Sequence, residues 1–198
     1  MCGRFFFEGD LEEVIRKFAI EEVDDRSREY GEIFPSNEFP IVINKKQNIL
    51  AHYRWGFSAP FLKNIIINAR LETIDTKPMF KGAFKERRCV IPVSYYFEWK
   101  AEEGKKVKHK IFMKSEKHFY LAGLYGSFHD KKGEAYNGFT IITTNPLSDL
   151  AHIHDRMPLI LKDDQLELWL DSTIRDIDML KEMVKERINL PPLLVEPA

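Results

Sequence analysis

Cys2 directly follows Met1 in this chain of 198 residues. If that methionine is the initiator, the small Cys2 side chain favours its removal, which leaves an amine and a thiol on neighbouring carbons. The amine has an ordinary pKa of about 7.7–8.0 and the thiol of about 8.5, so both have a reactive fraction near neutral pH. Such an aminothiol can attack an acyl carbon, or it can condense with an aldehyde and close to a thiazolidine. Position alone also allows Cys2 to be an ordinary small residue.

Glu98 and Asn68 stand in sequence contexts that favour chemistry. Glu98 is the lone carboxylate in the aromatic run of residues 95–99. If it is buried there, its pKa is raised and it suits proton transfer; on the outward face of a strand it is merely solvated, and the run allows both interpretations. Asn68 follows the β-branched run of residues 65–67, which predicts a buried strand. A polar group at the exit of such a strand is held rigidly, so Asn68 is a candidate site residue.

His154 lies in a polar segment that ends at Pro158. His152 and His154 are two positions apart and would face one metal ion only from a strand, and no third ligand is spaced with them. We therefore expect no metal and no cofactor. His154 beside Arg156 fits an acid–base or phosphate-contact role, with a lone structural histidine as the alternative.

The charge distribution is uneven, although the formal net charge is only −1. Residues 8–38 hold eleven acidic residues against four basic ones, whereas residues 81–110 hold nine basic residues against four acidic ones. Local patches decide what a surface attracts, so the basic cluster of residues 105–110 is either a solvated face or a surface for an anionic partner.

The composition indicates a globular protein. Hydrophobic residues make up 44% of the chain, and neither a long apolar run nor a basic-then-apolar leader is present. The two cysteines have no disulfide or metal spacing, which suits a reducing compartment. We expect a cytoplasmic monomer without a membrane segment.

The periodicity predicts a single α+β domain over residues 1–198, built on a mostly antiparallel sheet that is curled into a distorted barrel. Strands are expected at residues 39–44 and 48–55 as a hairpin, and a short helix at 78–85. Peripheral helices are expected near both ends, one capped by Asp10 and others over residues 163–188, with the tail to residue 198 packed on the body. Trp55 is either a core residue or a surface for base stacking.

Successive segments of the chain resemble one family. They are Met1-Cys2-Gly3-Arg4-Phe5, residues 68–73, residues 88–92 with Phe97-Glu98-Trp99, residues 122–124, and Thr143-Thr144 with residues 153–158. In this order they are similar to the motifs of the SOS-response-associated peptidase (SRAP) family, and the resemblance covers residues 2 to about 161.

The resemblance implies a protein of the DNA damage response that senses abasic sites in single-stranded DNA and crosslinks to them covalently. Cys2, once exposed, would form a thiazolidine with the aldehyde of the damaged sugar, and lyase-type chemistry would accompany such a step. The family is also named for a presumed peptidase activity, for which autoproteolytic exposure of Cys2 is one explanation. As a bacterial protein it would associate with the nucleoid.

The resemblance also implies roles for individual residues. Asn68 would position the reacting N-terminus or sugar, Glu98 would shuttle protons, and His154 would assist sugar opening and reversal of the crosslink. The DNA-binding residues would be Arg4, Arg70 and Arg156, which hold phosphates, and Trp55, which stacks on a base. Tyr95 stands where the family usually has glycine, which puts the local backbone and the groove beside Glu98 in doubt.

Two other functions fit parts of the sequence. A glutamine amidotransferase also begins Met-Cys-Gly and uses the aminothiol as an acyl nucleophile, but the later motifs of that family, such as its His-Thr-Arg segment, are not found here. A non-catalytic single-strand binding module would use the basic patch and aromatic residues alone. It would bind in a salt-sensitive manner and would never become covalent.

Overall fold

Five strands close into a barrel. The computed structural model describes residues 2–9, 11–23, 30–59, 62–185 and 190–198. The ring consists of β5 (Asn48–Trp55), β4 (Glu38–Asn44), β7 (Arg88–Val93), β10 (Phe119–His129) and β11 (Ala135–Thr144). Neighbours in this order are antiparallel, and a parallel pairing of β11 with β5 closes the ring. The predicted α+β fold with a curled, mostly antiparallel sheet is confirmed, as is the hairpin of β4 and β5.

Short elements extend the barrel. They are β2 (Glu22–Val23), β6 (Asn68–Arg70), β12 (Met157–Pro158), β13 (Ile160–Leu161) and the 3-10 helices η1 (Leu71–Thr73) and η2 (Ser148–Leu150). Strand β6 runs parallel to β11, with Asn68 opposite Ile141. The barrel wall therefore holds Asn68 in place.

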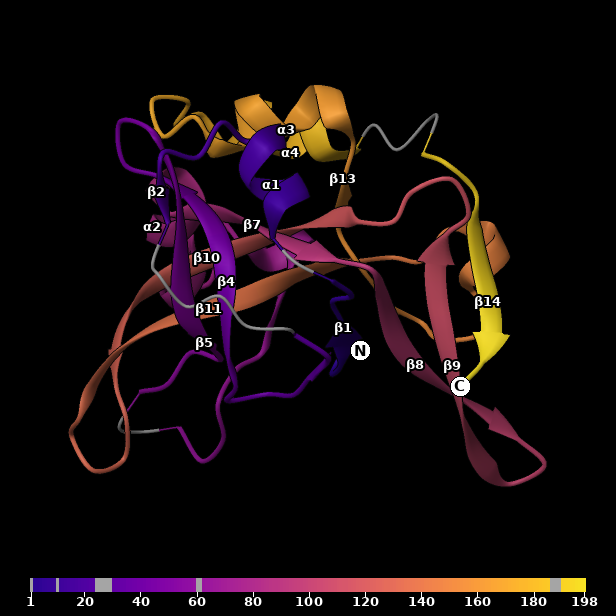
Figure 1. Ribbon diagram of the computed structural model, residues 1–198. Coiled ribbons are helices and arrows are strands. Elements are labelled where there is room, and N and C mark those ends of the chain that lie inside the picture. Colours follow the sequence, from indigo (N-terminus) through magenta and orange to yellow (C-terminus); the bar gives the residue numbers. More distant parts are fainter. Residues whose placement is uncertain (1, 10, 24–29, 60–61, 186–189) are drawn as a thin grey trace.

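A second sheet lies beside the barrel. Its order is β14 (Leu193–Pro197), β9 (Lys105–Met113), β8 (Tyr95–Glu102), β1 (Phe5–Phe6) and β3 (Glu32–Ile33). Figure 1 shows the long β8–β9 hairpin with β14 along its side. The hairpin turns at Glu103 and Gly104, which have φ angles of 48° and 79°.

The described helices cover the outside of the sheets. They are α1 (Glu12–Lys17), α2 (Pro78–Glu86), α3 (Asp163–Leu170) and α4 (Ile177–Lys185). In Figure 1, α1, α3 and α4 gather at one end of the molecule. The predicted cap Asp10 lies outside the described residues. Lys162 is the N-cap of α3, and its backbone N–H donates to Gln165 Oε1 at 2.9 Å.

One predicted strand is wrong. In the run 65–67, Ile66 forms only an isolated bridge with Phe57, Ile65 is 36% exposed, and the strand begins at Asn68. The Ile65 side chain packs over Gly56, where an added Cβ would lie 2.9 Å from Ile65 Cδ1. The run 65–67 thus packs over Gly56 and does not form a continuous strand. No helix of the described segments is long and apolar enough to cross a membrane.

The core is rich in aromatic rings. Trp55 is fully buried, lies 5.1 Å from the Phe5 ring, and stacks on Phe139 at 6.1 Å between centroids. Gly123 marks the closest approach of strands, because a Cβ there would lie 2.8 Å from Cys89 Sγ and would also meet Ile91. This packing fixes β1, and with it the start of the chain, against the barrel.

Candidate active site

Cys2 is fully buried where the second sheet meets the barrel. Backbone pairing of β1 with β8, including the Phe97 N–H to Arg4 O bond of 2.9 Å, lays the segment before β1 beside Glu98. From the barrel, Asn68 Nδ2 donates to Cys2 O at 3.0 Å. Burial, followed by the nearby charge of Glu98, raises the pKa of the Cys2 thiol well above its ordinary value. The sulfur is therefore held as a neutral thiol.

Glu98 is a buried carboxyl group on β8, and only 2% of the residue is exposed. Burial disfavours the carboxylate and raises the Glu98 pKa from 4.5 to about 7. Of the two interpretations that the sequence allowed, the buried one is confirmed. A group that titrates near neutral pH can both accept and return a proton.

His154 faces Glu98, with Nε2 3.9 Å from Glu98 Oε2. Its Nδ1 lies 2.6 Å from Asp155 Oδ1 and 3.1 Å from the Arg156 backbone N–H. These two contacts need opposite protonation of Nδ1. The Arg156 backbone N–H has a fixed direction and donates to Nδ1, so the proton of the neutral ring is on Nε2. Burial lowers the His154 pKa, which favours this neutral ring, with its Nε2–H facing Glu98 Oε2.

Asn68 has a second polar atom at this place. Its Oδ1 is buried and accepts no hydrogen bond from the described residues. Leaving a buried acceptor unpaired costs about 1–3 kcal/mol. The atom suits an incoming N–H or O–H donor next to Cys2. The structure thus brings Cys2, Asn68, Glu98 and His154 together from four separate stretches of the chain.

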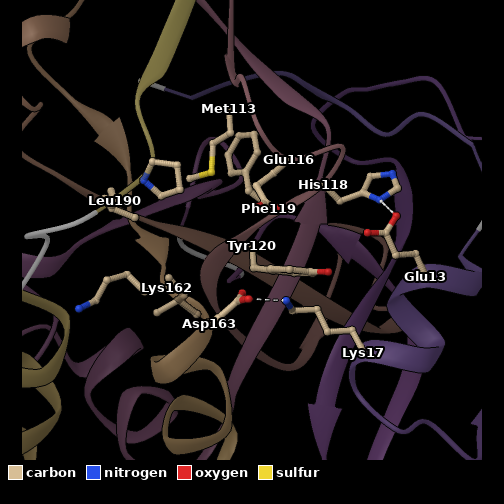
Figure 2. Close-up of a pocket in the computed structure, with 12 residues that line it drawn as sticks. Glu13, Lys17, Met113, Glu116, His118, Phe119, Tyr120, Lys162, Asp163 and Leu190 are labelled. Carbon is tan, nitrogen blue, oxygen red and sulfur yellow. Dashed lines mark hydrogen bonds and ion pairs between the residues drawn. The ribbon is translucent and has the colours of Figure 1, made fainter.

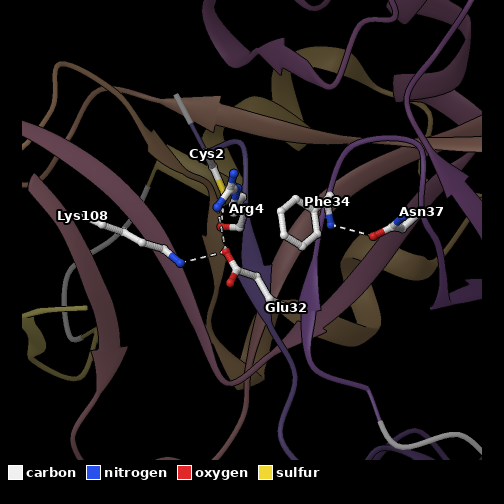
Figure 3. A network of polar contacts seen from close by, with 6 residues as sticks. All are labelled: Cys2, Arg4, Glu32, Phe34, Asn37 and Lys108. Carbon is white, nitrogen blue, oxygen red and sulfur yellow. Dashed lines mark hydrogen bonds and ion pairs between the residues drawn. The ribbon is translucent and has the colours of Figure 1, made fainter. Parts of the chain in front are cut away.

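A cationic cluster lies two residues along from Cys2 and is shown in Figure 3. The Arg4 guanidinium is 3.2 Å from Glu32 Oε1, and Lys108 Nζ is 2.8 Å from the same oxygen. Arg4 also lies over the rings of Phe34, at 4.5 Å, and Trp99, at 5.3 Å. The sequence indicated Arg4 by the family resemblance, and Lys108 only as part of the basic cluster of residues 105–110. The alternation of lysines on β9 was a signal that Lys108 and Lys110 share one face.

Arg156 does not have the expected phosphate-contact position. Only 8% of it is exposed, and its guanidinium forms a bidentate pair with Glu72 at 3.0 and 2.8 Å. The same group donates to Asn145 Oδ1 and Thr143 O. Because these carboxylate and carbonyl oxygens already occupy its terminal nitrogens, Arg156 is a structural tie under the His154 segment. Arg70, by contrast, is exposed at the end of β6.

Trp55 offers no face to a base. It is fully buried, and its indole N–H donates to Ile67 O at 3.0 Å. The structure therefore contradicts the predicted stacking role, because the ring belongs to the barrel core. The half-buried Trp99 next to Arg4 and the 39% exposed Phe34 are the aromatic side chains at this surface.

Tyr95, which stands where the family usually has glycine, does not distort the local backbone. It is a regular residue of β8, opposite Phe6 and Phe112, and it is not among the described residues with positive φ. Its ring stacks on Phe6 at 4.7 Å with an angle of 9° between the planes. The strand simply continues through this position.

A pocket of about 240 Å³ lies elsewhere, between α1, β10 and α3 (Figure 2). Its charges pair with one another: His118 Nδ1 is 3.1 Å from Glu13, and Lys17 is 2.8 Å from Asp163. None of the four site residues, Cys2, Asn68, Glu98 and His154, lines it. Over the part of the chain that the structure describes, no group of three His, Cys, Asp or Glu side chains is arranged to hold a metal ion.

Residues 1–192 match the family model described as SOS response associated peptidase (SRAP). The chain belongs to the SRAP family. One SRAP relative, the abasic site processing protein YoqW of Bacillus subtilis, is 35% identical over 198 residues and covers 93% of this chain and 87% of its own. The abasic site processing protein YedK of Escherichia coli is 28% identical, over 88% of this chain and 81% of its own.

More distant comparisons agree on the SRAP fold. The abasic site processing protein HMCES of Gallus gallus is 27% identical over 69% of this chain and 52% of its own length. A crystal structure of a Bacteroides thetaiotaomicron protein superposes with a TM-score of 0.80 at 23% identity, and covers 99% of this chain and 91% of its own. At that identity the similarity shows the fold alone.

Proposed function

We propose that this protein captures abasic sites in single-stranded DNA by a covalent bond to Cys2. The observation that carries the proposal is the environment of Cys2: a neutral thiol within the field of a carboxyl group whose pKa is about 7. The family membership and the names of the relatives, which are abasic site processing proteins, support the substrate. The protein would act as a cytoplasmic monomer on damaged DNA, without metal or cofactor.

The reaction starts once removal of Met1 frees the Cys2 amine. Glu98 as carboxylate accepts a proton from the ammonium group, and the amine attacks the aldehyde carbon of the ring-opened sugar. Glu98 then returns the proton to the hydroxyl of the addition product, which leaves as water and gives a protonated imine. Sulfur bonds to the carbon of the C=N bond, nitrogen keeps its proton as the ring amine, and the thiol proton passes to the Glu98 carboxylate. The ammonium form of the aminothiol and the aldehyde thus give a thiazolidine, water and one proton, which Glu98 holds, with no change of oxidation state.

The raised thiol pKa favours this order of events. A thiolate attack on an acyl carbon needs the thiol to lose its proton first. In the aldehyde route the amine attacks first, and the neutral thiol adds to an electrophilic imine. The environment of Cys2 is therefore better suited to an aldehyde than to the amide of glutamine.

Asn68 and His154 have supporting roles in this proposal. Asn68 holds the Cys2 carbonyl through Nδ2, and its unpaired Oδ1 would accept a hydrogen bond from the reacting amine. His154, whose Nε2–H faces Glu98, would assist opening of the sugar ring and reversal of the crosslink. Arg4 and the exposed Arg70 would hold flanking phosphates.

The test is to mix the protein with a single-stranded oligonucleotide that carries one abasic site, and to follow the product by denaturing gel and intact mass. We expect an adduct of protein that lacks Met1, with the mass of both components minus one water. Cys2→Ala should give none, and an undamaged oligonucleotide should give none.

Cys89→Ala is the matched control, because it removes the other cysteine, which is also buried, and should leave the adduct intact. If wild-type protein verified to lack Met1 forms no adduct, the proposal is wrong. A glutaminase assay and a salt titration of DNA binding then decide between the acyl-transfer and non-covalent alternatives.

A further inference from the structure

A carboxylate stands between two cations near Cys2, Arg4 and Lys108 (Figure 3). Glu32 Oε1 contacts both Arg4, at 3.2 Å, and Lys108, at 2.8 Å. The three side chains come from the start of β1, from β3 and from β9, so the sheet brings them together from distant parts of the sequence. All three are partly open to solvent, with 37%, 24% and 26% of the Arg4, Lys108 and Glu32 side chains exposed. An anion from solution can therefore reach the cations.

The two cations do not depend on Glu32 alone for their positions. Arg4 is also held over the Phe34 ring, and Lys108 Nζ lies 3.6 Å from the centre of the Phe97 ring. Aromatic faces attract a cation without cancelling its charge. If Glu32 lost its charge, Arg4 and Lys108 would therefore remain in place and keep two positive charges for a ligand.

We propose that Glu32 is an internal competitor for DNA phosphate, which occupies the position between Arg4 and Lys108 until a strand displaces it. The inference rests on the proposed function, since it concerns the same DNA-binding surface. Phosphate and carboxylate oxygens both accept from Arg and Lys in the same geometry. Binding of a strand is therefore an exchange of one anion for another, and the net gain per phosphate is small.

The consequence is weak binding to intact DNA and selective retention of damaged DNA. A strand without a lesion exchanges with Glu32 and leaves. A strand with an abasic site is kept by the covalent bond to Cys2, which Glu32 does not affect. Glu32 would thus lower the time that the protein spends on undamaged single strands.

The experiment measures affinity for an undamaged single-stranded oligonucleotide by fluorescence anisotropy over a range of salt concentrations. For Glu32→Gln we expect about 3- to 10-fold tighter binding at low salt, and a slope of log K against log salt that is steeper by up to about 0.7, equivalent to one more phosphate neutralised. Intact competitor DNA should also suppress crosslinking of the Glu32→Gln protein at a lower concentration than it does for wild type.

Glu196→Gln is the matched control. Glu196 pairs with Lys110 of the same strand β9, at 3.1 Å, so this variant removes an equal charge and frees a lysine that lies over Tyr95 and Phe112 and not over the rings that hold Arg4. We expect a change of less than about twofold. Glu32→Ala provides a second neutral variant, and thermal unfolding verifies that each protein is folded.

The sign of the effect decides the outcome. If Glu32 merely positions Arg4 and Lys108, both neutral variants bind DNA more weakly than wild type, and the inference is overturned. An affinity equal to that of wild type, or an equal gain in Glu196→Gln, overturns it as well. Failure of the proposed function appears separately, as the absence of an adduct with wild-type protein and abasic DNA.

Discussion

Two groups of charged side chains in this site differ in their access to water. Glu98 and Arg156 are 2% and 8% exposed, and the protein alone decides their partners and protonation. Arg4, Glu32 and Lys108 are partly exposed, and an ion or ligand from solution can exchange with their contacts. Burying a charged group costs free energy and shifts its pKa. An exposed ion pair contributes little to stability, so a ligand can exchange with either partner. The buried group therefore suits proton transfer and structural contacts, and the exposed group suits reversible binding.

Glu98→Gln should have the largest effect, on the chemical step. The amide cannot carry a proton between the ammonium and the departing hydroxyl, and loss of general acid–base catalysis typically costs about 10²–10⁴-fold in rate. Single-turnover crosslinking at saturating DNA measures this. We expect DNA affinity to stay within about twofold of wild type, because the group is buried. A crosslinking rate near that of wild type would show that another residue carries out the proton transfer.

Glu98 should also link stability to pH. Its pKa rises from 4.5 to about 7 on folding, so the folded state binds this proton more tightly than the unfolded state. The resulting stabilisation is complete below the unfolded pKa and is lost as the pH rises through about 7. The difference amounts to about 3 kcal/mol. Urea unfolding at several pH values should show this loss in wild type and not in Glu98→Gln; equal pH profiles would contradict the raised pKa.

Arg156→Ala should destabilise the fold. It removes the bidentate pair with Glu72 and the hydrogen bonds that Arg156 donates to Asn145 Oδ1 and Thr143 O. Breaking a buried pair costs about 3–5 kcal/mol, and the partial exposure of Glu72 reduces this to about 2–3 kcal/mol. Chemical unfolding measures the loss, and Arg156→Lys should recover only part of it. A variant of normal stability with weak DNA binding would restore the phosphate role for Arg156.

Arg4→Ala should have the smallest effect, and only on binding. The exposed guanidinium contributes little to stability, so we expect unfolding within about 1 kcal/mol of wild type. Affinity for single-stranded DNA should fall by about 3- to 10-fold, and the salt slope should become shallower by about 0.7. Anisotropy and urea unfolding on the same sample separate the two quantities. A large loss of stability would show that Arg4, like Arg156, has a structural role.

Local sequence patterns predicted the helices and strands correctly more often than they predicted the environment of a single side chain. The hairpin of residues 39–55, the helix from Pro78 and the barrel-like sheet follow from periodicity and turn residues, which act over a few positions. The run 65–67 has the composition of a buried strand, but its Ile65 side chain packs over Gly56, nine positions earlier in the chain. Composition alone does not show whether an apolar run pairs as a strand in a sheet or packs over another part of the chain.

The same limit explains the errors at Trp55 and Arg156. A tryptophan next to a glycine and an arginine next to a histidine look equally suited to DNA and to a core. Trp55 faces Phe5 and Phe139, and Arg156 faces Glu72. These partners are separated from them by many positions, and no local signal identifies them. Glu98 had the same ambiguity, which its surroundings resolved in favour of burial.

The parallel pairing that closes the barrel also has a consequence for folding. It joins Arg54 to Gly138 and Trp55 to Phe139, residues far apart in the chain, and β6 with Asn68 aligns on the same strand β11. Such long-range contacts form late and slowly, because the entropy of closing a large loop is lost before the contact is made. The hydrogen bond from Asn68 to Cys2 O therefore depends on the completed fold. Under the proposed mechanism, the site would become competent only at the end of folding.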